Sequence, residues 1–207
     1  MPESIKVFVS YSWETETHTQ IVDELEKFCP DYGITLIRDS NTLKHGDSID
    51  KFMKELSRCD HVITLFSKPY FESKWCMYEL HEVFKRGDFA ERTHPVIADE
   101  CNLQDRKYRL DCGNFWKKEH EQIKSDLQGI DPDDVIEERK ESNLYRDISQ
   151  NINQILNFAK RRNTTPLAEL RKKSFAPLLE SINPIKPDTP PKKPPSPPDH
   201  KYLHNFS

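Results

Sequence analysis

The sequence predicts an α/β fold in which a parallel sheet is covered by helices on both faces. Short apolar stretches of strand length alternate with amphipathic stretches of helical spacing over most of the 207 residues. Eight of the fifteen prolines fall between residues 184 and 198, where a packed core cannot form. A chain of this length accommodates one ordinary domain and an appendage.

Four compact apolar stretches read as strands: Ile5–Val9, Ile34–Ile37, His61–Phe66 and Pro95–Ala98. Residues 108–111 form a short candidate for a fifth. Ligands of parallel sheets bind outside the carboxyl ends of the strands. The segments expected at that edge are Ser10–Trp13, Asp39–Gly46, Ser67–Trp75 and the chain from Asp99 onward.

Apolar residues at helical spacing predict helices around residues 21–29, 49–56, 74–85, 115–128 and 144–159. The helix over 74–85 has an expected buried face of Cys76, Leu80, Val83 and Phe84. Trp75 and Glu79 lie one turn apart on a different, polar face of this helix.

Three segments are expected along the chain. Residues 1–163 form the folded domain, and residues 164–183 form a short amphipathic helix that Pro177 interrupts. Residues 184–207 form a proline-rich linker or tail that favours extended polyproline II. Its Pro-x-x-Pro sequences would fit an SH3-like groove, although a simple spacer is the preferred interpretation.

Composition excludes several classes of protein. The formal charge is −4, with 31 basic and 35 acidic residues, so the basic excess of a nucleic-acid clamp is missing. The longest apolar runs are strand-sized, far short of the ~20 residues that cross a bilayer, and the N-terminus does not resemble a signal peptide. We therefore expect a cytoplasmic protein that contacts neither nucleic acid nor membrane.

The cysteines, histidines and glycines of the sequence do not show the spacings that build common metal and cofactor sites. The five cysteines form no CxxC pair, the eight histidines show no metal-ligand spacing, and both glycine-rich phosphate loops are missing from the sequence. We expect reduced, mostly buried thiols, no bound metal and no cofactor. Cys76 is interpreted as a buried helix residue rather than a nucleophile.

Three motifs, in order, resemble the TIR (Toll/interleukin-1 receptor) domain family. Residues 5–12, IKVFVSYS, resemble its first box, and residues 37–46, IRDSNTLKHG, resemble its second box and BB loop. Residues 73–80, SKWCMYEL, resemble the S-x-W-C-x-x-E-L stretch of bacterial and plant members. The resemblance covers residues 4–98 strongly, residues 101–163 weakly and the tail not at all. It implies a flavodoxin-like fold with a five-stranded parallel sheet.

Some members of this family cleave NAD+ at the nicotinamide–ribose bond, and others are adaptors that act only through TIR–TIR contacts. In the cleaving group the catalytic Glu follows a Trp by four residues, a spacing that Trp75 and Glu79 match. Asp39, Leu43 and Gly46 match the loop pattern, while Ser48 replaces an aromatic residue found in some cleaving relatives. The resemblance thus implies Glu79 as the catalytic residue and NAD+ as a substrate rather than a cofactor.

The chemistry suits a single carboxylate. Glycosidases need a second one to protonate their leaving group, but the cationic nicotinamide of NAD+ leaves as a neutral ring. Glu79 would stabilise the ribosyl cation and hold its hydroxyls, and Trp75 would stack on the pyridinium. The opposing interpretation has Trp75 packing on a loop and Glu79 solvated at the surface.

Further candidate substrate-binding residues follow the first two strands. Trp13 could stack on a base or anchor a loop, and Ser10 and Tyr11 could contact phosphates or only end the strand. Asp39 could position the BB loop or a ribose, with a structural turn slightly favoured. Lys44 and His45 offer positive charge for a diphosphate.

Two functions therefore compete. The first is an NAD+ nucleosidase that makes ADP-ribose or a cyclic isomer, is activated by self-association and acts in immune or antiviral defence. The second is a non-catalytic adaptor. Either would pair with a sensor domain or protein partner, and the Trp75/Glu79 pair favours the enzyme. A receiver-type domain would place an acidic cluster where Ser10 and its neighbours stand.

Overall fold

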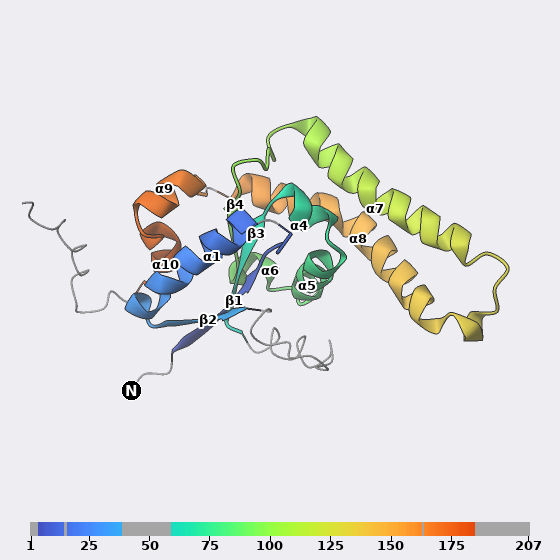
Figure 1. Ribbon diagram of the computed structural model, residues 1–207, viewed down its shortest axis with the longest axis horizontal. Coiled ribbons are helices and arrows are strands. Elements are labelled where there is room, and N and C mark those ends of the chain that lie inside the picture. Colours follow the sequence, from blue (N-terminus) through green and yellow to red (C-terminus); the bar gives the residue numbers. More distant parts are fainter. Residues whose placement is uncertain (1–3, 15, 39–58, 163, 185–207) are drawn as a thin grey trace, which may run out of the picture.

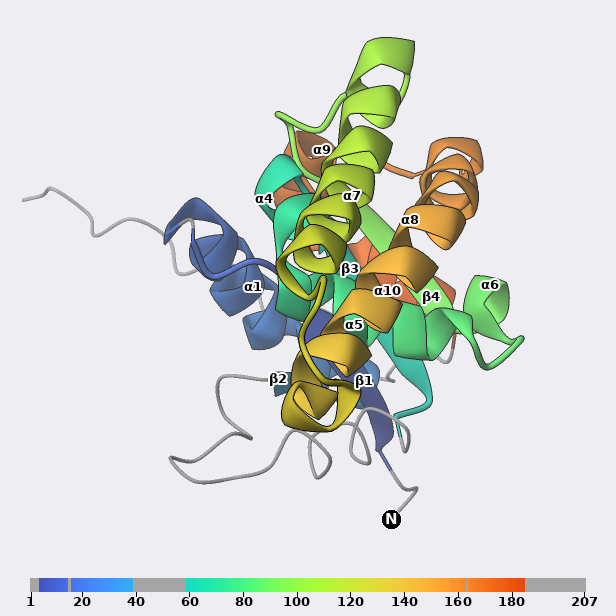
Figure 2. The ribbon, with the colours of Figure 1, turned by 90° about the vertical axis from the view of Figure 1, so that its right-hand side faces the viewer.

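The computed structural model describes residues 4–14, 16–38, 59–162 and 164–184. Four strands, β1 (Ile5–Ser10), β2 (Ile34–Arg38), β3 (His61–Phe66) and β4 (Thr93–Ile97), form a parallel sheet in the order β2-β1-β3-β4. Helices flank the sheet on both sides (Figures 1 and 2). The predicted α/β class is confirmed, and four strands rather than five lie within the described part of the chain.

Helix α1 (Glu16–Phe28) covers one side of the sheet and buries Ile21, Val22 and Leu25. The short helix η1 (Cys29–Tyr32) follows and ends at Gly33, whose φ of 64° is a left-handed conformation that glycine adopts without strain. Gly33 thereby turns the chain directly into β2. Main-chain pairing of β1 with β2 and with β3 makes β1 an interior strand.

Two helices follow β3. Helix α4 (Lys68–Glu72) starts at Ser67, whose side chain accepts a hydrogen bond from the Tyr70 amide. Helix α5 (Lys74–Phe84) starts at Ser73, which caps the Cys76 amide in the same way. The bounds of α5 agree with the predicted helix. A one-turn helix, α6 (Phe89–Arg92), then leads into β4.

The prediction of a fifth strand at residues 108–111 is wrong, because these residues belong to helix α7 (Arg106–Asp126). Asp105 caps that helix by accepting from the Lys107 amide at 2.9 Å. Cys112 and Trp116, four residues apart, are its buried residues. The helical period extends over the whole segment and overrides the short strand-like pattern within it.

Helix α8 (Ile136–Arg161) packs along α7, and the two form a hairpin that extends beyond the sheet (Figure 1). The turn η2 (Pro132–Asp134) lies between them at the tip. The helix predicted around 144–159 is confirmed and is longer than its apolar pattern. Its buried residues, Ile148, Ile152, Ile155, Leu156 and Ala159, continue the core between α8 and α5.

Residues 167–182 form two helices rather than the single interrupted helix that the sequence suggested. These are α9 (Leu167–Lys172) and α10 (Ala176–Ile182). Pro177 lies in the first turn of α10, where its missing amide hydrogen costs nothing. Both helices bury their leucines in the same core as the sheet.

Candidate functional site

The carboxylate of Glu79 lies at the carboxyl end of β1, where α5 packs on that strand. The hydroxyl of Ser10, the last residue of β1, donates a hydrogen bond of 2.6 Å to Glu79 Oε2. Only 6 % of Glu79 is exposed. A buried carboxylate requires hydrogen bonds to compensate for lost hydration, and Ser10 supplies one of them.

Tyr70 of α4 completes a chain of hydroxyl groups behind Glu79. The Tyr70 hydroxyl lies 2.9 Å from Ser10 Oγ. Burial raises the pKa of Tyr70 well above its usual value, and the charges of Cys76 and Glu79 act in the same direction. Tyr70 therefore stays protonated. Because the single proton of Ser10 is directed to Glu79, Tyr70 is the donor to Ser10.

Tyr70 was not among the predicted site residues, although it lies in the segment Ser67–Trp75 that was expected at the ligand-binding edge. The structure confirms that the end of β1 and the segment after β3 meet at the carboxyl edge of the sheet. Tyr70 could have been found as a site residue only from its place in the topology, because its residue type alone does not indicate a site. A Tyr that follows a strand inside an aromatic cluster otherwise resembles ordinary core.

Trp75 and Glu79 do not share a polar face. Glu79 is buried, whereas 51 % of Trp75 is exposed. The expected buried residues Cys76, Leu80 and Val83 are buried, and Phe84 packs partly buried against them. The interpretation of Glu79 as a solvated surface charge is therefore wrong. Trp75 remains a large exposed ring one turn from a buried carboxylate.

A cation already lies near the Trp75 ring. The Nζ of Lys74 is 5.4 Å from the ring centroid, and it also binds Glu141 of α8 at 2.7 Å. The indole thus sits in a setting that attracts positive charge. Trp13, in the segment after β1, is 55 % exposed and offers a second large apolar surface.

Tyr11 is buried, with 4 % of its surface exposed. Its backbone carbonyl accepts a weak hydrogen bond from the Cys76 thiol at 3.5 Å. All five cysteines are free and buried, as expected. Burial raises the pKa of Cys29 to about 12, which keeps that thiol protonated.

Three predicted site residues, Asp39, Leu43 and Gly46, lie outside the described residues, as do the helix expected around 49–56 and the residues Ser48, Lys44 and His45. The described chain before them ends at Arg38, which is buried at the end of β2. Arg38 binds Asp23 at 2.6 Å and also pairs with Glu26, both from α1.

The fourth predicted segment, from Asp99 onward, also reaches this edge of the sheet. Glu100 lies 2.8 Å from the ring of His18, near the start of α1. Among the described residues, no cluster of three or more His, Cys, Asp or Glu side chains could hold a metal ion. No described helix is long and apolar enough to cross a membrane.

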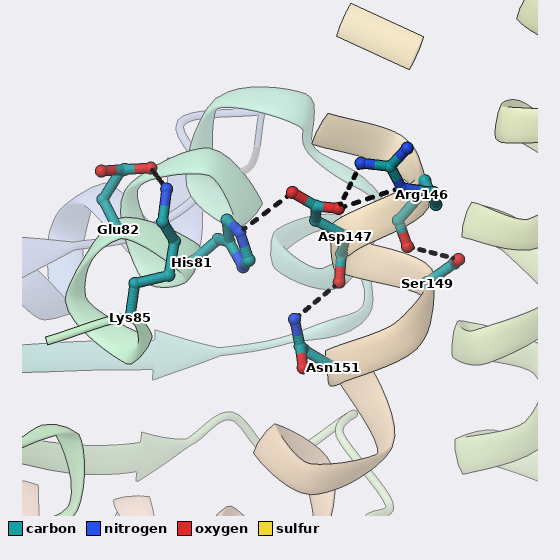
Figure 3. A network of polar contacts seen from close by, with 7 residues as sticks. All are labelled: His81, Glu82, Lys85, Arg146, Asp147, Ser149 and Asn151. Carbon is teal, nitrogen blue, oxygen red and sulfur yellow. Dashed lines mark hydrogen bonds and ion pairs between the residues drawn. The ribbon is translucent and has the colours of Figure 1, made fainter. Parts of the chain in front are cut away.

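On the opposite side of α5, His81 approaches Asp147 of α8 (Figure 3). His81 Nε2 lies 4.0 Å from Asp147 Oδ2, and Arg146 binds the other oxygen of Asp147 at 3.1 Å. Burial lowers the pKa of His81, as does nearby Lys85, whereas Asp147 and Glu82 oppose them. The two sides of α5 therefore contact different partners: Glu79 faces β1 and His81 faces α8.

The order of elements, the buried carboxylate and the exposed Trp agree with a known family. The family model of the TIR domain matches residues 7–128. This chain belongs to the TIR domain family. The matched part includes β1 from Val7 onward, the other three strands, α5 and α7, and thus both Ser10 and Glu79.

Relatives of this TIR domain include plant and archaeal proteins. It is 25% identical to the TMV resistance protein N of Nicotiana glutinosa over 129 residues, covering 61% of this chain and 11% of that protein. It is 32% identical to the disease resistance protein TAO1 of Arabidopsis thaliana over 114 residues, which cover 54% of this chain and 9% of that protein. It is 27% identical to a probable 2′ cyclic ADP-D-ribose synthase, TcpO of Methanobrevibacter olleyae, over 94 residues. These residues cover 45% of this chain and 27% of that protein. The chain thus matches only a minor part of each.

A solved structure supports the fold. The TIR domains of the activated Roq1 resistosome, which directly recognises the pathogen effector XopQ, match with a TM-score of 0.52 and 20% identity. The match covers 83% of this chain and 98% of that one. At this identity the likeness establishes the fold alone.

Proposed function

We propose that this TIR domain cleaves NAD+ between nicotinamide and ribose, with Glu79 as the catalytic residue. The observation that carries the proposal is a buried carboxylate, held by Ser10 at the ligand-binding edge of the sheet, one helical turn after a half-exposed Trp. The similarity to a probable 2′ cyclic ADP-D-ribose synthase supports it, because a cyclic ADP-ribose is one of the products that this bond cleavage can give.

Each site residue has a distinct proposed role. The nicotinamide ring stacks on the part of Trp75 that Lys74 leaves uncovered, and the carboxylate of Glu79 faces the ribose. The C–N bond breaks, its electron pair goes to the ring nitrogen, and nicotinamide leaves neutral. Negative charge fixed beforehand near the ribosyl cation lowers the barrier without reorganisation. Ser10 positions the carboxylate, since its proton is directed to Glu79.

The ribosyl cation is then captured by an oxygen nucleophile. Attack by water gives ADP-ribose and releases one proton, whereas attack by a hydroxyl of the same molecule gives a cyclic isomer and also releases one proton. Trp13 and the loop residues Asp39, Leu43 and Gly46 are proposed to contact the rest of NAD+, and no cofactor is needed. The resistance proteins among the relatives support a role in immune defence, with self-association as the activating step.

The test is nicotinamide release from NAD+ by the purified chain, measured by chromatography both free and clustered by fusion to a multimerising tag. We expect release from the clustered protein, and we expect Glu79→Gln to lose it. The matched control is Glu82→Gln, which changes a partly exposed carboxylate of the same helix, one that binds Lys85 within the described chain. Circular dichroism checks that both variants fold.

Three results would count against the proposal. If the clustered wild-type chain releases no nicotinamide, the domain is an adaptor rather than an enzyme. If Glu79→Gln turns over NAD+ as the wild type does, Glu79 is not the catalytic residue. If Glu82→Gln loses activity to the same extent, the loss reflects helix α5 in general.

A further inference from the structure

A large cavity lies far from Glu79, at the opposite edge of the sheet. It has a volume of about 1120 Å³ and is formed by the start of β4, the end of α8, and helices α9 and α10. His94 and Pro95 line it at the amino end of β4, whereas Ser10 marks the carboxyl end of β1. Because all strands are parallel, this groove and the candidate catalytic site occupy opposite edges.

The groove has an apolar floor and a positively charged rim. Phe158, Leu170 and Leu178 contribute apolar surface, and Arg161 and Arg162 stand at the end of α8. The Arg162 guanidinium lies 4.9 Å from the Phe158 ring centroid. Neither arginine forms an ion pair with any residue whose position the structure describes.

Two other ionisable groups line this groove. Glu91 of α6 contributes one negative charge. Burial, with the charges of His61 and Arg162, lowers the pKa of His94 to about 4, so His94 is neutral at pH 7. The two arginines therefore determine the sign of the rim, and the groove suits a ligand that combines carboxylates with apolar side chains.

The tip of the α7–α8 hairpin has the opposite character. Residues 126–138 contain six acidic residues and no basic one. Ile130 and Ile136, which flank the acidic turn η2, are 43 % and 54 % exposed. Of these acids, only Glu137 forms an ion pair within the described chain, with Lys140 of the next turn. The tip thus combines exposed isoleucines with carboxylates.

The tip cannot reach the groove of its own molecule. Helix α8 begins at the tip and ends at the groove, and its 26 residues span about 39 Å at 1.5 Å per residue. Figure 1 shows the hairpin pointing away from α9 and α10, which line the groove. Any contact between tip and groove must therefore be made by two molecules.

We propose that the acidic hairpin tip of one copy docks in the basic groove of a second copy. The isoleucines of the tip cover the apolar floor, and the aspartates meet Arg161 and Arg162. The contact is heterologous because two different surfaces meet, so each copy keeps a free tip and a free groove. Repeating it produces a ring or an open filament. The inference does not depend on the proposed activity, since it concerns binding alone.

The experiment uses charge reversal in the full chain and measures mass by light scattering across a concentration series at low salt. The tip variant is Asp133→Lys/Asp134→Lys/Glu137→Lys/Glu138→Lys, which spares the capping residue Asp131 and leaves two acidic residues, Asp126 and Asp131, against four lysines in residues 126–138. The groove variant is Arg161→Glu/Arg162→Glu. The control, Lys117→Glu/Lys118→Glu, makes the same charge change as the groove variant at exposed positions on α7.

We expect the wild type and the control to grow in mass with concentration, and each reversed variant to stay monomeric. Like charges across the contact should weaken association by at least about tenfold. A mixture of the tip and groove variants should assemble, because every junction then regains opposite charges. A chain carrying both reversals should assemble for the same reason.

Three outcomes would overturn the proposal. The first is a wild-type chain that remains monomeric up to its solubility limit. Either variant could assemble by itself as the wild type does, which would place self-association on another surface. The mixture could stay monomeric although both variants are folded by circular dichroism. NAD+ cleavage enters none of these readouts, so failure here leaves the proposed activity to its own test.

Discussion

Ser10→Ala is the substitution that most directly tests the hydroxyl chain behind Glu79. It removes the 2.6 Å hydrogen bond to the carboxylate and leaves the fully buried Tyr70 hydroxyl without its Ser10 partner. A hydrogen bond to a charged group contributes about 1.5–3 kcal/mol, and an orphaned buried donor costs about 1–3 kcal/mol. We expect the free energy of unfolding to fall by about 2.5–6 kcal/mol.

Tyr70→Phe should cost less, about 0.5–1.5 kcal/mol, because Ser10 keeps Glu79 as its acceptor. In the double variant the Tyr70 hydroxyl is also removed, so the loss of Ser10 leaves no buried hydroxyl without its hydrogen-bond partner. Its loss should therefore be smaller than the sum of the single losses by about 1–3 kcal/mol. The assay is urea unfolding at neutral pH, followed by tryptophan fluorescence and circular dichroism.

Ser12→Ala is the matched control. Ser12 is also buried just after β1, and its hydroxyl has no hydrogen-bond partner within the described chain. Its removal should leave stability nearly unchanged or raise it. The hydroxyl chain would be refuted by a Ser10→Ala loss no larger than that of Ser12→Ala. Additivity of the Ser10 and Tyr70 effects within about 0.5 kcal/mol would refute it equally.

Three further predictions concern the scaffold. Since the folded pKa of His94, about 4, lies below its ordinary value of 6.5, the unfolded chain binds the proton more readily. Stability should be complete above pH 6.5 and fall as the pH drops toward 4, and urea midpoints of His94→Gln should show a shallower fall. Trp116→Ala should cost about 3–5 kcal/mol in urea unfolding, because the ring is buried and donates to the Phe71 carbonyl at 2.6 Å; a loss below about 1 kcal/mol would contradict this packing. Arg171→Ala, which breaks a surface ion pair with Glu24, should change stability by less than about 1 kcal/mol, as differential scanning calorimetry can check.

Much of the sheet was predictable because its strands are short, apolar and separated by amphipathic helices. The wrong fifth strand shows the limit of that approach. Four residues around Leu110 resemble a strand when taken alone, yet Tyr108, Cys112 and Trp116 recur at intervals of four. The period becomes visible only over a window longer than the one that suggested the strand, and the Asp105 cap fixes where the helix begins.

The candidate site was predictable as a place but not as a set of contacts. Topology brings the end of β1 to the segment after β3, and this followed from the alternation of strands and helices. The hydrogen bond between Ser10 and Glu79, 69 residues apart, did not. A helical pattern assigns a glutamate to the solvent face, because the pattern carries no information on whether a hydrogen-bond donor is available in the core.

The burial of Glu79 bears on how assembly could control such a site. Hydrogen bonding to Ser10 fixes the carboxylate on the β1 side of α5, and the other side of α5 packs on α8, with His81 near Asp147 (Figure 3). A carboxylate held in this way needs no movement to act, since preorganised charge is already in place. The step that self-association supplies in the proposed mechanism is therefore completion of the substrate-binding surface around Trp75, rather than repositioning of Glu79.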